Sequence, residues 1–118
     1  MSYERILIVG NLGGNPELRT VGEQQVANFS VAVNRKKGDK QVTTWYRVAA
    51  WGATADAASR YLKKGSRVLV EGSGLRASAY LDNAGKPQAS LELTADRLIF
   101  LDGAPGSASG EPEEDLPF

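Results

Sequence analysis

The chain has 118 residues, with 14 Lys and Arg, 14 Asp and Glu, and no Cys or His, so its formal net charge is zero. This length suits one folded domain with a single core. The composition excludes disulfides, thiolate nucleophiles, an imidazole general base and metal sites built on Cys or His. The first apolar run, 6–9, is far shorter than the roughly 20 residues of a membrane span. We therefore expect a soluble cytoplasmic protein with no catalytic residues, no metal and no cofactor.

The zero net charge is the sum of two opposed parts. Residues 1–102 hold all 14 basic side chains and ten acidic ones, a net charge of +4, whereas residues 103–118 hold four acids and no base. A basic body with an acidic end is compatible with an acidic ligand, which the total charge conceals.

The first half of the chain alternates apolar and polar residues with the period of a half-buried strand. The alternation is clearest at 26–34, and a Gly, Asn and Pro cluster at 10–16 separates the two segments before it. The predicted strands of this half are 5–11, 17–21, 26–34 and 42–51. The charged segment 35–40 is predicted to be a hairpin loop.

The period then becomes helical. An alanine-rich helix is predicted at 53–64, with Gly65 as its left-handed C-terminal cap. Further strands are predicted at 67–72, 75–81, 87–94 and 97–101, with a turn at 82–85. From residue 103 the composition cannot bury enough apolar surface to offset ordering, so we expect a folded domain at 1–102 and a disordered acidic tail at 103–118.

Three strands, a helix and further strands are the element order of an OB-fold, a five-stranded Greek-key barrel that commonly binds oligonucleotides or oligosaccharides. The fold class is thus all-β with one helix. Small SH3-like barrels are the alternative, but they usually lack a full helix after the third strand.

The strand at 42–51 carries the strongest candidate site. Trp45, Arg47 and Trp51 alternate onto one face, and burying Arg47 there without a partner would cost several kcal/mol. We expect this face to be exposed, where the indoles could stack on bases and nearby cations could attract phosphates. An ordinary core strand beside a solvated loop is the competing interpretation. The candidate cations of the loop are Arg35, Lys36, Lys37 and Lys40.

Other candidate nucleic-acid-binding residues lie at the end of the predicted helix and beyond it. Lys63 and Lys64 flank its end, and Arg76 and Tyr80 share strand parity on the next hairpin. Their ordinary explanation is a helix C-terminus that favours cations and a common strand aromatic.

A dinucleotide-binding pattern, G-x-G-x-x-A, occurs at 72–77. It lacks the helix that must begin inside the pattern, so a small nucleotide-binding enzyme is the weakest of the functions considered.

Distributed motifs resemble the bacterial single-stranded DNA-binding protein (SSB) family over nearly the whole chain. They are IVGNLG at 8–13, NPELR at 15–19, VANFSVA at 26–32, WYRV at 45–48 with WG at 51–52, ASRYLKKGS at 58–66, VEG at 70–72 and EDLPF at 114–118. The resemblance implies a non-enzymatic protein that coats single-stranded DNA in replication, recombination and repair, with little sequence preference, and that is associated with the nucleoid.

The resemblance also implies roles for particular residues. Trp45, Trp51 and Tyr80 match stacking aromatics, and Lys63, Lys64 and Arg76 match basic positions along the DNA path. Where many members place another Trp, this chain has Arg35, followed by a short loop. Most members are homotetramers, which implies the same assembly here.

The end of the chain is similar to the acidic tip by which the family recruits replication, recombination and repair proteins. A flexible acidic end with an apolar Phe118 and a free carboxylate suits a shallow basic pocket. An alternative function is an adaptor resembling the OB-fold primosome protein, which mainly docks other proteins. The predicted partner-binding residues are Glu113, Glu114, Asp115, Leu116, Pro117 and Phe118.

Overall fold

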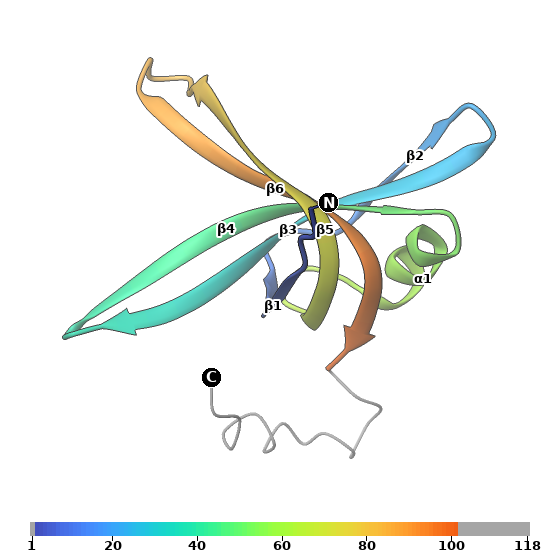
Figure 1. Cartoon of the computed structure of the whole chain (residues 1–118), viewed down its shortest axis with the longest axis horizontal. Helices are drawn as coiled ribbons and strands as arrows, with labels where there is room; N and C mark the ends of the chain where they lie inside the picture. Colours follow the sequence, from blue (N-terminus) through green and yellow to red (C-terminus); the bar gives the residue numbers. More distant parts are fainter. Residues whose placement is uncertain (1, 102–118) are drawn as a thin grey trace.

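The computed structural model describes residues 2–101. They form a set of curved strands with one short helix at their side, and paired strands extend away from the centre (Figure 1). In chain order the elements are β1 (Ile6–Leu12), β2 (Glu17–Val21), β3 (Gln24–Lys37), β4 (Lys40–Trp51), α1 (Ala53–Tyr61), β5 (Arg67–Leu81) and β6 (Pro87–Phe100).

The strands form a closed barrel. Their order in the sheet is β1-β5-β6-β4-β3-β2, and a further pairing of β1 with β3 closes the ring. The β4–β6 pair is parallel and the other pairs are antiparallel. Five strands thus form the barrel wall and β2 extends it, so the predicted OB-fold is confirmed.

The barrel core follows from the alternation along the strands. Val31, Val48, Val68 and Val70 are fully buried because each faces inward from its strand. Helix α1 closes one end of the barrel with Ala55 and Ala58, whose small side chains allow close packing.

The segment 35–40 is not a loop, and that prediction is wrong. Strand β3 continues to Lys37, β4 begins at Lys40, and only Gly38 and Asp39 form the turn. Gly38 has a φ of 66°, which permits so tight a reversal. The polar strands also gain a cross-strand hydrogen bond, in which Thr43 Oγ1 donates to Asn34 Oδ1 over 2.6 Å.

Strands β5 and β6 are each continuous where two shorter strands are predicted. The register shifts between Glu71 and Gly72 and between Ser73 and Arg76 bend β5 without ending it. At the first shift, a Cβ on Gly72 would collide with the Thr94 carbonyl oxygen. The glycines of this segment therefore mark a bend in a strand rather than a break.

The helix is shorter than predicted and ends at Tyr61. Leu62 adopts an extended backbone that turns its side chain into the core, where it is buried. Gly65, with a φ of 90°, donates its backbone N–H to the Leu12 carbonyl, so it ties the following turn to β1 and does not cap the helix. The helix ends at Tyr61, before the predicted Lys64, because the extended Leu62 packs its side chain in the core.

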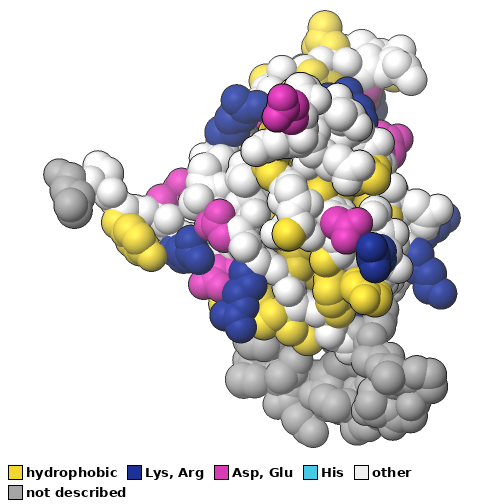
Figure 2. Space-filling model, turned by 90° about the vertical axis from the view of Figure 1, so that its right-hand side faces the viewer, with side chains coloured by type: hydrophobic (Ala, Val, Ile, Leu, Met, Phe, Trp, Pro, Cys, Tyr) yellow, Lys and Arg dark blue, Asp and Glu magenta, His cyan; other side chains and the backbone are white. Residues whose placement is uncertain are grey.

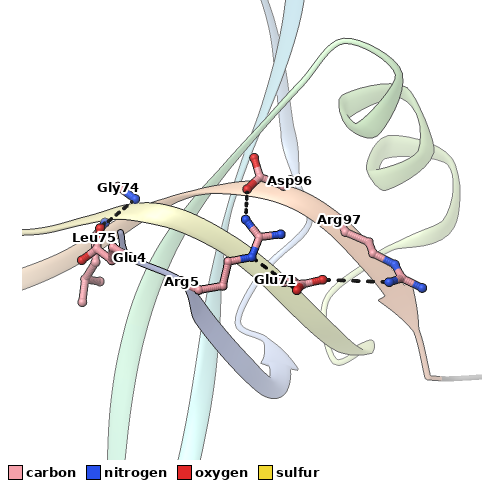
Figure 3. A network of polar contacts seen from close by, with 7 residues as sticks. All are labelled: Glu4, Arg5, Glu71, Gly74, Leu75, Asp96 and Arg97. Atoms are coloured by element: carbon pink, nitrogen blue, oxygen red, sulfur yellow. Dashed lines mark hydrogen bonds and ion pairs between the residues drawn. The ribbon is translucent and has the colours of Figure 1, made fainter. Parts of the chain in front are cut away.

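A group of exposed ion pairs joins Arg5, the residue before β1, to β5 and β6 (Figure 3). Arg5 donates to Asp96 over 2.8 Å and to Glu71 over 3.4 Å, and Arg97 lies 4.0 Å from Glu71. Burial lowers the pKa of Arg5, but the hydrogen bond to Asp96 and the charges of Glu71 and Asp96 outweigh it, so the pKa is raised. The start of the chain is thereby held across β5 to β6.

Two sequence predictions concern residues beyond this region. The tail 103–118 and its tip at 113–118 lie outside the described residues, as does the domain boundary at 102. Within residues 2–101, no helix is long and apolar enough to cross a membrane.

Candidate nucleic-acid interface

The exposed face of β4 carries both tryptophans, as the alternation predicts. Trp45 and Trp51 are 52% and 39% exposed, and Arg47 between them is also exposed. Val48 and Ala50 point the other way, into the core. The sheet therefore offers two indoles with a guanidinium between them to solvent.

A groove runs across this face. It consists of two adjoining hollows of about 450 and 590 Å³, which share Asn28, Arg47 and Val48. Large and open to solvent, the groove suits an extended chain better than an enclosed small molecule. The first hollow is otherwise lined by Gly13, Gly14, Asn15, Glu17, Phe29, Ser30 and Trp45, and the second by Ala49, Gly74, Arg76, Glu92, Leu93 and Thr94.

Strand register extends the same face to β6 and β5. Arg47 pairs with Glu92 on β6, and Glu92 pairs with Arg76 on β5. Directly paired residues point to the same side of a sheet. Tyr80 has the parity of Arg76 and is 52% exposed. The register thus places Arg76 and Tyr80 on the face of Arg47.

Arg76 is paired with an acidic residue. Its Nε and one terminal nitrogen both donate to Glu92 Oε1, over 3.1 and 3.0 Å. The Arg76 side chain is nevertheless 76% exposed, against 30% for Glu92. The cation can therefore reach a phosphate, but Glu92 competes for it.

The basic hairpin is only partly turned toward the tryptophans. Lys36 pairs with Gln41, which has the parity of Trp45, so Lys36 shares the tryptophan face. Arg35, Lys37 and Lys40 fall on the other face of the hairpin. The sequence predicts that these four cations lie in one loop. In the structure they lie on two paired strands, whose alternation directs them to both faces of the hairpin.

Lys63 and Lys64 lie near the first hollow. The Lys64 backbone N–H donates to Asn15 Oδ1 over 2.8 Å, and that of Lys63 donates to Ser66 Oγ over 3.0 Å. Because Asn15 lines the first hollow, the first of these bonds places the Lys64 backbone at its margin, with Lys63 next to it in the chain.

Several residues of the groove escaped the sequence analysis. Gly13 lies against the Trp45 ring, Asn28 lies between the two hollows, and Glu92 holds Arg76. The parity of Asn28, which pairs with Ala49, could have indicated its face. Gly13 and Glu92 depend on contacts between distant segments, which no local pattern reveals.

The side of the molecule that carries α1 is different in character. Basic and acidic side chains are interspersed there with apolar ones, without a concentration of positive charge (Figure 2). Tyr61 packs against Phe100 with ring centroids 5.4 Å apart.

Two kinds of ligand site, for a dinucleotide and for a metal ion, can be checked against the structure. Residues 72–77 lie within β5, so the glycine pattern opens no helix and cannot form a dinucleotide-binding turn. Among residues 2–101, no cluster of three or more acidic side chains is placed to hold a metal ion.

Comparison with known proteins identifies the family. Residues 3–101 match the single-strand binding protein family, which covers the whole barrel. The chain belongs to this family. It is similar to single-stranded DNA-binding protein 1 of Chlorobaculum tepidum, with 35% identity over 90% of this chain and 68% of that protein. It is also similar to the single-stranded DNA-binding protein of Thermotoga maritima, with 33% identity over 97% of this chain and 84% of that protein.

Membership of the single-strand binding protein family agrees with the resemblance seen in the sequence motifs. The matched region includes the loop before β2, the tryptophan strand β4, and β5, which carries Arg76 and Tyr80.

Proposed function

We propose that this chain binds single-stranded DNA along the groove, largely without regard to sequence and without catalysing a reaction. The supporting observation is the exposed face of β4, where Trp45 and Trp51 flank Arg47 beside a groove that is open to solvent. Every base has a π-face, so stacking on indoles binds DNA with little sequence preference.

The path of the DNA follows from the charged residues at the two ends of the groove. Lys63 and Lys64 lie beside the first hollow, Arg76 lines the second, and Tyr80 lies farther along β5. A strand that stacks on the tryptophans and passes Arg47 would meet cations at both ends. Lys36 lies on the same face, whereas Arg35, Lys37 and Lys40 require a strand that wraps around the hairpin.

Titration of the protein with a thymidine homopolymer across a range of salt concentrations tests this function. We expect strong quenching of tryptophan fluorescence and a slope of about −0.7 in log K against log salt per neutralised phosphate. Replacing either Trp45 or Trp51 by Ala removes a stack worth about 1–3 kcal/mol. Tyr61→Ala is the control, because Tyr61 is an exposed aromatic at the end of α1 and does not line the groove. Equal affinities of all variants would contradict the proposal.

We also infer from the sequence that the tip at 113–118 recruits replication, recombination and repair proteins. Its acids and terminal Phe118 suit basic pockets on such partners. A pull-down with and without residues 116–118 tests this role. The inference requires loss of the partner proteins and unchanged DNA binding in the truncated chain.

A homotetramer is the assembly we propose. The outer face of β1, β5 and β6 carries apolar side chains, of which Leu7 is 59% exposed while Val9, Leu69 and Ile99 are half-buried. A second copy of the chain would remove this apolar strip from water. Sedimentation equilibrium reports the assembly, and a monomer at all concentrations would contradict it.

A further inference from the structure

The loop after β1 contains two adjacent glycines that the backbone conformation does not require. The described glycines with positive φ are Gly22, Gly38, Gly52, Gly65, Gly74 and Gly85. Gly13 and Gly14 are outside this set, so alanine could adopt the backbone of either position. A glycine here must be explained by its surroundings.

The surroundings of the two glycines differ sharply. A Cβ on Gly13 would lie 2.6 Å from Cζ3 and 2.8 Å from Cη2 of Trp45, closer than real Cβ atoms come to other heavy atoms. A Cβ on Gly14 would have no heavy atom within 4 Å. The atoms approached belong to the six-membered ring of the indole, the part farthest from the β4 backbone. Gly13 therefore lies against the outer edge of the Trp45 ring and forms a seat for that edge.

The backbone leading into Gly13 is held by two hydrogen bonds. The Gly13 N–H donates to the Ser30 carbonyl over 3.0 Å, and the Leu12 N–H donates to the Ser66 carbonyl over 2.9 Å. Trp45, in contrast, is 52% exposed, and the atoms that a Cβ would meet are at the far end of its side chain. A methyl group at position 13 would therefore displace the indole more readily than the backbone.

We propose that Gly13 is a positioning residue that holds the Trp45 indole in the orientation needed to stack on a DNA base. The proposal rests on the DNA-binding function proposed above. An indole fixed in advance loses less conformational freedom on binding than a mobile one, so Gly13 raises the affinity for DNA through Trp45. The absence of a side chain is the functional feature of this position.

The seat itself can be tested without DNA. In a Trp51→Phe background Trp45 is the only tryptophan of the chain, so fluorescence reports on that ring alone. We expect Gly13→Ala to increase acrylamide quenching of Trp45 because the ring leaves the loop. Gly14→Ala in the same background is the matched control and should leave quenching unchanged. Equal quenching in the two variants would overturn the proposal, even if the protein bound no DNA.

The effect on DNA is tested with a double-mutant cycle, using the anisotropy of a labelled thymidine oligomer. We expect Gly13→Ala to weaken binding about tenfold, equivalent to partial loss of one base stack. The slope of log K against log salt should stay the same, because no cation is altered. In a Trp45→Phe background the shorter phenyl ring does not reach Gly13, so Gly13→Ala should have little further effect. Additive effects would refute the positioning role.

Folding of the variants provides the last check. Far-UV circular dichroism and thermal unfolding show whether Gly13→Ala folds. If it does not fold, recovery of folding in the Gly13→Ala/Trp45→Phe double variant supports the seat, and continued misfolding contradicts it. If wild-type protein binds no DNA, the proposed function fails while the acrylamide result still decides whether Trp45 rests on Gly13.

Discussion

Arg76 has a protein partner and, in the proposed complex, a phosphate partner. Both of its hydrogen bonds in the free chain go to a single oxygen of Glu92, and its side chain is largely exposed. Exposed ion pairs contribute little to stability. A phosphate can therefore replace Glu92 as the partner of Arg76 with little loss of folding stability. The negative charge of Glu92 nevertheless repels the phosphate.

Replacing Glu92 by Gln should strengthen DNA binding. The change removes a negative charge from the groove and frees Arg76 for phosphate, so affinity at low salt should rise several-fold. The slope of log K against log salt should steepen by about 0.7 if one more phosphate is neutralised. Fluorescence titrations at several salt concentrations measure both quantities.

The control for this variant is Asp56→Asn. Asp56 forms an ion pair with Arg60 on α1, so the control removes the same charge and the same kind of pair away from the groove. Similar gains in affinity from the two variants would assign the effect to net charge and not to Arg76.

At the scale of elements, the outer β5–β6 hairpin is stabilised by its turn. Asp82 Oδ1 accepts the backbone N–H groups of Ala84 and Lys86, each over 2.9 Å, and Asp82 Oδ2 accepts from Gln88 Nε2 over 3.0 Å. The hydrogen bond from the Lys86 backbone is the main cause that lowers the pKa of Asp82, followed by that from Gln88. Gln88 pairs with Tyr80, so the turn also orders the neighbourhood of a proposed stacking residue.

The lowered pKa of Asp82 makes the hairpin sensitive to acid. A carboxyl whose pKa is lower in the folded than in the unfolded chain stabilises the fold above its unfolded pKa. That stability is lost as the pH falls from near 4 through the folded pKa. In Asp82→Asn the loss of stability between pH 5 and pH 2 should be shallower than in wild type.

Thermal unfolding at a series of pH values measures this difference. Asp39→Asn changes an acid in the turn of the β3–β4 hairpin and is the matched control. Wild-type and Asp82→Asn curves that stay parallel over this pH range would contradict the role of Asp82.

The bend in β5 depends on a glycine whose space is occupied by a neighbouring strand. A Cβ on Gly72 would strike the Thr94 carbonyl of β6, which belongs to the barrel wall. We expect Gly72→Ala to lower the free energy of unfolding by about 1–3 kcal/mol, as overpacking does in well-packed regions. Urea denaturation measures the change. Gly14→Ala should lower the free energy of unfolding far less. Equal losses in the two variants would show that β5 and β6 move apart at Gly72 without a penalty.

The same elements show what sequence can and cannot predict. Alternation in residues 45–51 correctly separated the exposed tryptophans from Val48 and Ala50, because period two is a local property. The length of β3 and β4 was missed because their polar outer halves are held by partner strands and not by burial. The early end of α1 was missed because it depends on the packing of Leu62 in the core.

Residues of the proposed DNA-binding face divide in the same way. Trp45, Arg47 and Trp51 could be found from one strand, and the shared parity of Arg76 and Tyr80 from another. The seat at Gly13 could not, because it joins the loop after β1 to the ring of a residue on β4. Contacts of this kind require the tertiary structure.

At the scale of the whole molecule, charge predicts competition between the chain's own acidic end and DNA. The described barrel carries every Lys and Arg of the chain, and the four acids at 111–115 follow it in sequence. We expect removal of residues 110–118 to raise DNA affinity modestly at low salt and to have no effect at high salt, where the attraction is screened. Titrations of the full and shortened chains at both salt concentrations test this. Identical low-salt affinities would exclude the competition.

The two-residue turn at Gly38 and Asp39 also makes the molecule convenient to observe. The chain has no cysteine, so Asp39→Cys would introduce a single thiol. It would lie at the tip of the β3–β4 hairpin, beyond the groove residues but on the strands that carry Trp45 and Lys36. A fluorophore attached there would report when a strand of DNA reaches the hairpin, independently of the tryptophans that stack on it.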